Sequence, residues 1–538
     1  MAKWWQDRVL YQIYPRSFAD MNGDGIGDIP GIIAHLDDLK ELGVGIIWLS
    51  PLYRSPDADN GYDISDYRDI DPKFGTMADM DRLIGEANRR DIKLVMDIVI
   101  NHTSSQHPWF VQGRDKQSPY RDYYIWQPGK NGSPPNNWMS LFGGSAWAYD
   151  EQSGEYYLHL FAPEQPDLNH RNPKVLEEVK GIMRFWLDKG ISGFRCDVIN
   201  IIYKSSLADS KRLIRGSEHY VSQVGMHEIL RAFRREVWSQ YDCFVVGETV
   251  FVTPQMGKDL CDAARGELDM IISFEHMETD QYFVKWFKRP FHAGRFGKTM
   301  AKWQTALEWS TVYLENHDQP RAVSRFGDDK RYWAESAKLL ATMLLSLRGT
   351  SFIYQGQEIG MTNFDFTGME QLQDVESRNI DKLARKLHLP KRYRWRMMQR
   401  TSRDNARTPM QWDSSANAGF TTGQPWLGVN SNHARINVAA QKNDPDSVRS
   451  YYKKMIALRS GSDVLKYGAF KLVAATKHLF CYDRERNGRI CRVLLNFGAR
   501  PQRVSASGAV LISSYGRTAY DGVLQPYEAV ILETEAGA

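Results

Sequence analysis

The 538-residue sequence predicts an α/β chain built on a (β/α)8 TIM barrel, with a small domain inserted after the third strand and an antiparallel β domain at the C-terminal end. Three observations support this fold class. Eight short apolar stretches alternate with segments of helical periodicity, whereas an open doubly wound sheet usually has fewer strands. A long segment after the third stretch has no sustained helical periodicity. The end of the chain has short alternating stretches separated by turn residues.

The apolar stretches are the predicted barrel strands, at residues 9–14, 45–50, 93–99, 191–198, 243–248, 270–274, 311–315 and 351–354. Helical periodicity between them is clearest at residues 32–42, 80–89, 174–188 and 332–347. We therefore expect strands and helices to alternate around one barrel.

The same pattern divides the chain into three domains. Residues 104–167 are rich in Trp, Tyr, Gly, Pro and Asn and are too long for a simple loop, so we predict that they form the inserted domain over the barrel mouth. The barrel is assigned to residues 1–103 and 168–465, with a second long excursion at 361–428. Residues 466–538 are predicted to form a C-terminal β-sandwich.

The composition excludes several classes of protein. The formal net charge is only +4 and both signs are mixed along the chain, so no basic stripe indicates a nucleic-acid partner. No apolar run is long enough for a membrane span, and the first 18 residues lack a signal-peptide core. The five cysteines are scattered without a CxxC pair, which is typical of a reducing compartment. We expect a cytoplasmic enzyme that is a monomer or a weak dimer, with no membrane partner.

Acidic and basic side chains gather where four of the predicted strands end. In a barrel of this kind the C-terminal ends of the strands carry function, while the strand interiors feed a packed core. One acid at a strand end is usually a structural hydrogen-bonding group, but four strands that each deliver one are hard to explain by chance. The residues concerned are Asp97, Asn101, His102, Arg195, Asp197, Glu248, Glu315, Asn316, His317 and Asp318. The sequence explains no role for Glu315.

Such a set of carboxylates suits the cleavage of a glycosidic bond. The glycosidic oxygen is a poor leaving group, so one carboxylic acid must protonate it while a second carboxylate meets the cationic anomeric carbon. Arg195 lies two residues before Asp197, on the same strand face, and would hold that carboxylate ionised. Glu248 follows an apolar Val-Val-Gly approach that would favour its protonated form. Spacing along the chain does not by itself decide between retention and inversion.

The four strand ends resemble the signature regions of the α-amylase family, glycoside hydrolase family 13, in the order in which that family shows them. The resemblance extends over nearly the whole chain, through VLYQIYPRSF at 9–18, QPDLN at 165–169 and RDNARTPMQW at 403–412. The QPDLN form is associated with the oligo-1,6-glucosidase and dextran glucosidase branch. The resemblance implies a retaining enzyme with Asp197 as nucleophile, Glu248 as general acid/base and Asp318 as transition-state stabiliser.

The same resemblance implies a pocket for the nonreducing end of the substrate. Tyr62 would stack on the glucose ring, while Asp59 and Arg407 would bind its far hydroxyls and close the pocket. A closed pocket implies exo-action, with one glucose released at a time. The full set of implied substrate contacts is Asp59, Tyr62, His102, Phe161, Arg195, Val198, His317 and Arg407.

Val198, directly after the predicted nucleophile, carries most of the information on linkage. From the residue alone it could simply be a β-branched side chain that fills space. In the resembling family, Val at this position accompanies α-1,6 cleavage, whereas Thr or Ala accompanies α-1,4 preference. We therefore expect a glucosidase for isomaltose, isomaltooligosaccharides and panose.

Three alternatives stay open at this point. The first is an α-1,4-preferring or sucrose-active α-glucosidase on the same scaffold. The second is a sucrose isomerase or transglucosidase, but these typically carry an RLDRD-like stretch before the seventh strand, where this chain reads RPFHAGR at 289–295. The third is a non-catalytic relative such as the ectodomain of amino-acid-transporter heavy chains. The presence of all three catalytic carboxylates opposes this alternative.

A loop after the first strand could hold a metal ion. Oxygen-bearing residues alternate with glycines as at the start of an EF-hand, but Gly31 stands where the twelfth-position Glu would be. A plain Asp/Asn/Gly turn is an equal reading of the residues alone. The resemblance implies a structural Ca²⁺ or Mg²⁺ and no catalytic cofactor. The implied ligands are Asp20, Asn22, Asp24, the carbonyl of Ile26, and Asp28.

Overall fold

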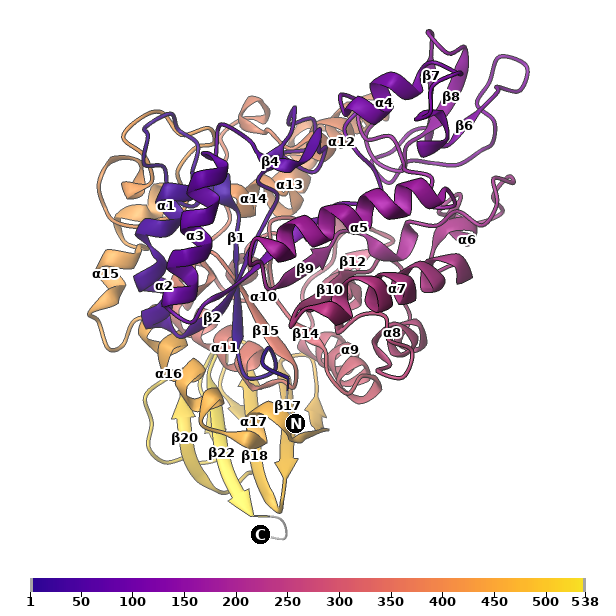
Figure 1. Cartoon of the computed structure of the whole chain (residues 1–538). Coiled ribbons are helices and arrows are strands. Elements are labelled where there is room, and N and C mark those ends of the chain that lie inside the picture. Colours follow the sequence, from indigo (N-terminus) through magenta and orange to yellow (C-terminus); the bar gives the residue numbers. More distant parts are fainter. Residues whose placement is uncertain (1–2, 536–538) are drawn as a thin grey trace.

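A computed structural model describes residues 3–535, so the outermost parts of the predicted barrel and C-terminal domain ranges, residues 1–2 and 536–538, lie outside it. Eight parallel strands form one sheet in the order β11-β10-β9-β5-β2-β1-β15-β14 (Figure 1). The predicted (β/α)8 barrel is confirmed. The strands are β1 (Val9–Ile13), β2 (Val44–Leu49), β5 (Lys93–Ile98), β9 (Gly193–Cys196), β10 (Phe244–Glu248), β11 (Met270–Ile272), β14 (Thr311–Val312) and β15 (Thr350–Tyr354).

Helices surround the barrel because the strands are buried on both faces and need cover on the outside. Local signals set several helix ends. Thr76 and Asp79 form a capping box at the start of α3, and Asn172 caps α5 directly before Pro173. The surrounding helices are α1 (Ile29–Ala34), α2 (Leu36–Leu42), α3 (Met77–Arg89), α5 (Pro173–Asp188), α6 (Ser217–Tyr220), α7 (Val224–Glu236), α8 (Pro254–Cys261), α9 (Ala293–Ala306), α10 (Ala322–Phe326) and α11 (Trp333–Ser346).

Two expected elements differ in extent. The single helix expected at 32–42 is two helices, α1 and α2, because the chain leaves the helical conformation at His35, which has φ −107° and ψ 8°. The strand expected at 311–315 is only the two-residue β14. Backbone pairing sets the length of a strand, and in the described part of the chain β14 pairs on one side only, with β15.

The seam between β11 and β14 is where the barrel is not fully closed. Within residues 3–535 no strand pairing joins these two strands. Side chains bridge the gap instead. The hydroxyl of Thr311 donates to the carbonyl of Ile271 at 2.8 Å, and that of Tyr313 donates to the carbonyl of Ser273 at 2.9 Å.

The segment predicted as the inserted domain, residues 104–167, folds over one end of the barrel (Figure 1). It holds α4 (Pro108–Gly113) and a three-stranded antiparallel sheet in the order β6-β8-β7. The strands are β6 (Trp126–Gln127), β7 (Trp147–Asp150) and β8 (Glu155–Leu158). Shorter pairs of strands flank the barrel mouth, namely β3 (Tyr53–Arg54) with β4 (Asp66–Ile70), and β12 (Gln281–Tyr282) with β13 (Val284–Lys288).

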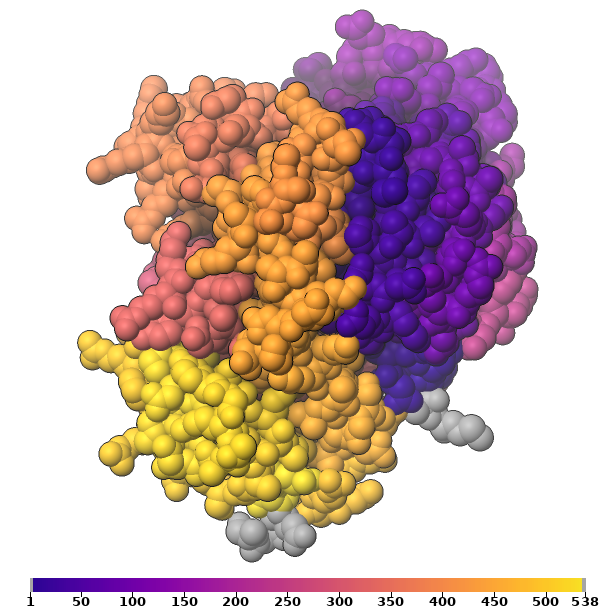
Figure 2. Space-filling view, turned by 90° about the vertical axis from the view of Figure 1, so that its left-hand side faces the viewer, coloured from indigo at the N-terminus to yellow at the C-terminus, as the bar shows by residue number. Residues whose placement is uncertain are grey.

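The long excursion after β15 returns to the start of the chain. In Figure 2 the orange residues lie directly against the indigo N-terminal ones. The Thr421 hydroxyl donates to the Asp20 carboxylate at 2.5 Å, and the amide of Met410 donates to the carbonyl of Ser17 at 2.8 Å. The helices after β15 are α12 (Val375–Lys386), α13 (Lys391–Thr401), α14 (Asp404–Arg407), α15 (Val438–Lys442), α16 (Val448–Ser460) and α17 (Asp463–Tyr467).

The C-terminal antiparallel sheet, which the sequence predicted, lies at the end of the molecule opposite the inserted segment (Figure 1). Its order is β16-β17-β18-β22-β20, with β19 and β21 as a separate pair. Its strands are β16 (Ala469–Ala475), β17 (Leu479–Arg486), β18 (Arg489–Asn496), β19 (Gln502–Arg503), β20 (Ala509–Ser513), β21 (Val523–Leu524) and β22 (Ala529–Glu535). No helix among the described residues is long and apolar enough to cross a membrane.

Candidate active site

Arg195 joins the carboxylates of three neighbouring barrel strands. Its Nη1 lies 2.7 Å from Asp97 Oδ1, at the end of β5, and 2.6 Å from Asp197 Oδ1, just after β9. Its Nη2 pairs with Glu248, the last residue of β10. All four side chains are buried. The parallel register explains the cluster, because the C-terminal ends of β5, β9 and β10 meet at one rim of the barrel.

Burial and charge set the two central carboxyl groups apart. Burial raises the pKa of Glu248 to about 8, since attraction by Arg195 only partly offsets the cost of a buried charge. Burial also raises the pKa of Asp197, but only to about 6, against the attraction of the same guanidinium group. The sequence predicted a low pKa for Asp197. Its pKa lies higher because burial outweighs the attraction of Arg195 and the nearby charge of Asp97 adds to the rise, yet the difference between the two groups has the expected direction.

Asp318, two residues beyond Asn316 at the end of the seventh strand segment, completes the acidic set from the opposite wall. Arg407 Nη2 donates to its Oδ1 at 2.7 Å, and Arg403 Nη1 lies 3.4 Å from the same atom. Although burial opposes ionisation, the neighbouring His317, whose Nε2 lies 3.4 Å from Oδ2, and the two guanidinium groups lower the pKa of Asp318 far below its usual value. Asp318 is therefore a fixed negative charge at any pH near neutrality.

Tyr62 and His317 form the floor of the site. The Tyr62 hydroxyl donates to Asp97 at 2.9 Å and lies 2.7 Å from Nε2 of His317, whose Nδ1 is 2.8 Å from the side-chain nitrogen of Gln12. The rings of Tyr62 and His317 are stacked at 5.2 Å. Burial lowers the pKa of His317 to about 3, so the imidazole is neutral. A neutral ring fixed at both nitrogens holds the phenol in place beside Asp97.

An ion pair that the sequence did not predict lies next to Asp318. Arg403 Nη2 lies 3.1 Å from Asp59 Oδ1, and both side chains are buried. We expected Asp59 to work together with Arg407, but Arg407 instead donates to Asp318 and to the His317 carbonyl. Asp59 and Arg407 thus belong to the same pocket with different partners.

With the geometry of the site described, the sequence and the fold of the chain can be compared with those of known proteins. A model of the α-amylase catalytic domain matches residues 12–468 of the chain. The chain belongs to the α-amylase family. It is 53% identical over 511 residues to a protein named oligo-1,6-glucosidase from Parageobacillus thermoglucosidasius, covering 92% of this chain and 91% of that one.

Solved structures give the same result for this α-amylase family member. Trehalose-6-phosphate hydrolase of Bacillus licheniformis matches with a TM-score of 0.95 at 41% identity, covering 99% of this chain and 100% of that chain. Isomaltulose synthase from Klebsiella sp. LX3 matches with a TM-score of 0.96 at 41% identity, covering 99% of each chain. The protein is therefore a glycoside hydrolase of this family.

His102 and Phe161 form one side wall of this family member's pocket. Their rings are 5.1 Å apart, and Nε2 of His102 is 3.1 Å from the Tyr62 carbonyl. Burial lowers the pKa of His102 to about 4, so this imidazole is neutral as well. Neutral imidazoles suit a role in hydrogen bonding to uncharged hydroxyls.

Val198 adopts a strained backbone conformation. Its φ of 34° lies in the left-handed region, which a β-branched residue rarely adopts and which costs on the order of 1–3 kcal/mol. Its side chain packs in an apolar cluster with Leu160 and Tyr220, and Phe161 and Val250 contact that cluster. Its amide lies 3.4 Å from Glu248 Oε2. Val198 therefore acts on the site through the shape of its wall and through its backbone.

Four residues of the site were not among the predicted substrate or catalytic residues. Asp97 lies under Arg195, and Gln165 reaches Asp59 at 3.4 Å and His102 at 3.1 Å. Arg403 lies 5.4 Å over the ring of Phe142, at the edge of the pocket. The motifs at 165–169 and 403–412 contain two of these residues, so the signal was present, but it did not show which members face the site.

The predicted metal-binding loop is closed by its own hydrogen bonds. Asp20 accepts from the amides of Asn22, Gly23 and Gly25, and Asp24 accepts from that of Ile26. The donor atoms are all oxygens, which suits a hard cation. Among residues 3–535, however, no three His, Cys, Asp or Glu side chains are grouped to hold an ion. Asp24 is exposed and would have to turn inward to share an ion with the buried Asp20 and Asp28.

Glu315 supports the site from behind. It is buried and lies 3.2 Å from Nη1 of Arg321, and it accepts a hydrogen bond from the amide of Ala322. Arg321 in turn donates to the carbonyls of Gln355, at 2.6 Å, and Ala406, at 3.2 Å. The pair therefore ties the segment before Asp318 to the backbone directly before Arg407.

Proposed function

We propose that the chain is a retaining, exo-acting α-glucosidase that hydrolyses α-1,6-glucosidic bonds at the nonreducing end of isomaltose and isomaltooligosaccharides. One observation carries the proposal. Asp197 and Glu248 share Arg195 at one rim, and the Asp59–Arg403 ion pair lies beside Asp318 in the same group of side chains. The name oligo-1,6-glucosidase, borne by several relatives at 45–53% identity, supports it.

The reaction proceeds in two steps on these residues. The Asp197 carboxylate attacks the anomeric carbon while Glu248 gives its proton to the glycosidic oxygen, so the covalent glucosyl-enzyme forms and the aglycone leaves. Glu248, now ionised, takes a proton from water as the water attacks the anomeric carbon. Glucose leaves with its α configuration, and both carboxyl groups return to their starting states. Asp318 offsets the positive charge that develops on the ring in both transition states.

Exo-action follows from the closed end of the pocket. Asp59 and Arg403 occupy the space where a further sugar would continue from the nonreducing end. A buried ion pair can accept and donate hydrogen bonds to the terminal 4- and 6-hydroxyl groups, and an internal glucose unit has one of these hydroxyls substituted. Only a chain end can therefore enter.

The α-1,6 preference rests on Val198 and is tested by kinetics. We expect kcat/KM on isomaltose to exceed that on maltose by at least about tenfold, roughly 1.4 kcal/mol of differential transition-state binding. Val198→Thr should narrow this ratio. Dextran and sucrose complete the series, and NMR of the first product should show α-glucose. A preference for maltose would remove the linkage assignment and leave the mechanism, whereas β-glucose as first product would remove the retaining mechanism.

A second candidate is transfer of the glucosyl group to a held sugar. The likeness to isomaltulose synthase of Klebsiella sp. LX3 favours this candidate. The segment 289–295, which departs from the RLDRD-like pattern, opposes it. Incubation with sucrose separates the two, because hydrolysis gives glucose and fructose in equal amounts. Isomaltulose or trehalulose as the main product would instead make the enzyme an isomerase.

We propose further that the loop from Asp20 to Asp28 binds a structural Ca²⁺ or Mg²⁺. Burial, together with the nearby charge of Asp20, raises the pKa of Asp28, and a cation between the two would relieve that cost. The reaction itself needs only the two carboxyl groups, so the ion would stabilise the loop. The five unpaired cysteines support our inference of a cytoplasmic enzyme. We propose that this enzyme acts as a monomer or a weak dimer.

A further inference from the structure

Two helices that follow β15 carry a large local excess of positive charge. Residues 375–401, which include α12 and α13, contain nine Lys and Arg residues and only two acids, Glu376 and Asp381, whereas the whole chain has a formal net charge of +4. Figure 1 shows both helices at the end of the barrel where the inserted segment lies, away from the C-terminal sheet. The small net charge of the chain therefore conceals a strongly basic part of its surface.

Six of these cations are exposed, and within residues 3–535 they form no ion pair. They are Lys382, Lys386, Lys391, Arg392, Arg396 and Arg400. Arg396 and Arg400 lie one helical turn apart on α13, and Lys382 and Lys386 are spaced in the same way on α12. Like charges at this spacing repel each other and destabilise a helix. An anionic partner would offset this repulsion.

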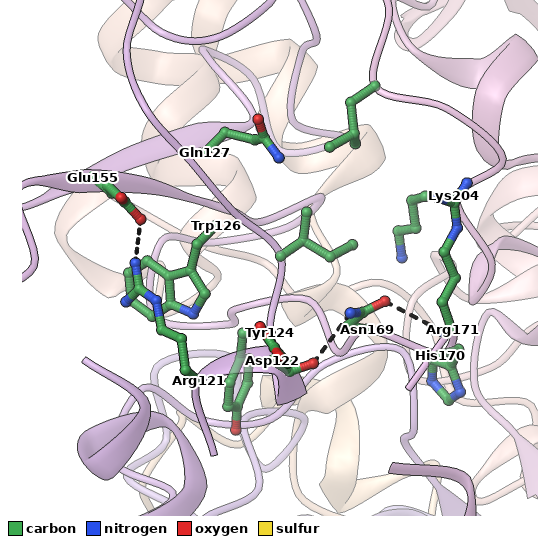
Figure 3. Close-up of a pocket in the computed structure, with 12 residues that line it drawn as sticks. Arg121, Asp122, Tyr124, Trp126, Gln127, Glu155, Asn169, His170, Arg171 and Lys204 are labelled. Carbon is green, nitrogen blue, oxygen red and sulfur yellow. Dashed lines mark hydrogen bonds and ion pairs between the residues drawn. The ribbon is translucent and has the colours of Figure 1, made fainter. Parts of the chain in front are cut away.

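The cations near the inserted segment are paired, by contrast. In the cavity between that segment and the barrel, Arg121 pairs with Glu155 (Figure 3). Lys204, on another wall of this cavity, lies 2.6 Å from Asp167. The lack of counter-ions on α12 and α13 is therefore a property of these two helices and not of this whole end of the barrel.

Exposed apolar side chains accompany the charge. Leu383 and Leu387, one turn apart on α12, are 51% and 65% exposed, and Tyr393 on α13 is exposed as well. At the turn between β12 and β13, Phe283 is 97% exposed. The residues on either side of it are also exposed, so residues 282–284 present three consecutive apolar side chains to solvent. Such a run is unusual on a soluble surface unless it serves a function.

The β12–β13 hairpin and the two helices form one packed unit. Trp286 of β13 is buried in an apolar cluster with Met397 and Met398 of α13. Lys285, the residue before this tryptophan, pairs with Glu376 of α12. The projecting phenylalanine is therefore held on the same structural unit as the unpaired cations.

This combination matches the surface of an anionic lipid bilayer. Basic side chains bind acidic headgroups, and apolar side chains enter the boundary between the headgroups and the acyl chains. A polyanion such as RNA would bind the cations but would offer no apolar environment to Leu383 and Leu387. A second copy of the chain would place like charges face to face across a symmetric interface.

We propose that α12, α13 and the β12–β13 hairpin form a docking surface for an anionic phospholipid bilayer. The proposal does not depend on which glycosidic bond the active site cleaves. It replaces our expectation of no membrane partner, which rested on the lack of a long apolar run, because surface docking needs no spanning segment. Glu376 of α12 lies 3.9 Å from Arg403, so the docking surface borders the candidate active site.

Vesicle flotation with the full chain tests the proposal. Vesicles of phosphatidylcholine with about one third phosphatidylglycerol should carry the protein upward in a density gradient, and vesicles of phosphatidylcholine alone should not. Binding should weaken as NaCl rises from about 0.05 to about 0.5 M. Lys382→Glu with Arg396→Glu reverses one charge on each helix and should weaken binding at least about tenfold.

Two further variants separate the apolar contribution from a general effect of charge. Phe283→Asn removes the apolar tip, and Asn tolerates the left-handed backbone at this position, where φ is 54°, so it should weaken binding several-fold with no loss of Tm. Arg500→Glu with Arg503→Glu is the matched control, because both residues are exposed in the C-terminal domain and the net charge changes equally. This control should float as the unmodified chain does.

Three results would overturn the docking surface. The first is the absence of flotation, or equal flotation with both kinds of vesicle. The second is a loss of binding in the control as large as that in Lys382→Glu with Arg396→Glu. The third is full binding by Phe283→Asn together with tight binding of single-stranded poly-uridylate, which would assign the basic helices to nucleic acid instead of lipid.

Discussion

The guanidinium group of Arg403 lies 3.1 Å from the carboxylate of Asp59, across 344 residues of sequence, and it is held from behind by Asp374 at 2.8 Å. Two segments that are distant in the sequence are thereby joined by a buried ion pair. Because Arg403 also lies 3.4 Å from Asp318, the same side chain touches both the closed end and the acidic wall of the site.

Replacement of Arg403 by lysine should show how far its contacts with Asp59 and Asp318 contribute to substrate binding and to turnover. Lysine keeps the charge but loses the planar fork that serves Asp59, Asp318 and Asp374 together. We expect KM for isomaltose to rise at least tenfold with a smaller fall in kcat, measured by initial rates of glucose release. Arg392→Lys, on the exposed side of α13, is the matched control and should leave both constants unchanged. An unchanged KM in Arg403→Lys would show that the ion pair does not bind substrate.

The activity should depend on pH through the two central carboxyl groups. Asp197 acts only when ionised, so the rate should fall as the pH drops through about 6. Glu248 acts only when protonated, so the rate should fall again as the pH rises through about 8. The measurement is kcat/KM for isomaltose between pH 4 and about 10. Glu248→Ala with an aryl glucoside, whose leaving group needs no proton, should lose the alkaline limb alone; persistence of that limb would assign it to another group.

Replacement of Glu315 by glutamine should destabilise the protein. It leaves the charge of Arg321 buried without its counter-ion, and breaking a buried pair costs about 3–5 kcal/mol. We expect a lower Tm by scanning calorimetry, together with a loss of kcat, because Arg321, which anchors the backbone before Arg407, loses the carboxylate that holds it in place. The double variant Glu315→Leu with Arg321→Met removes both charges and should recover much of the Tm without recovering kcat. Full recovery of kcat would show that the pair has no positioning role.

Removal of divalent ions should lower the stability and not the intrinsic activity. If the loop from Asp20 to Asp28 binds Ca²⁺, then the Tm should fall after EDTA treatment and rise again with added Ca²⁺, by an amount that grows with concentration. Asp20→Asn keeps an acceptor for the loop amides but removes a charge, so it should abolish the response. A Tm that EDTA leaves unchanged in the native chain would exclude the ion.

The sequence predicted most of the barrel because parallel strands buried on both faces appear as apolar runs that local periodicity detects. The strand ends also located Arg195, Asp197, Glu248 and Asp318. The features that the sequence did not predict depend on contacts between residues that are far apart along the chain. The partner of Asp59, the pair of Glu315 with Arg321 and the shortness of β14 are each set by a neighbour far along the chain. The left-handed backbone of Val198 was equally hidden, because Val signals an extended strand.

The seam between β11 and β14 makes one part of the barrel wall different from the rest. Among residues 3–535 the backbone amides of β11 and β14 that face the seam have no partner strand, so they should exchange with deuterium earlier than those of β1 or β2. The stretch leading from β14 to Asp318 is anchored across this seam by the side chains of Thr311 and Tyr313. On gentle heating, the barrel should therefore open first at this seam, which moves Asp318 away from Asp197 and Glu248. Catalytic activity should then be lost several degrees below the temperature at which the whole molecule unfolds.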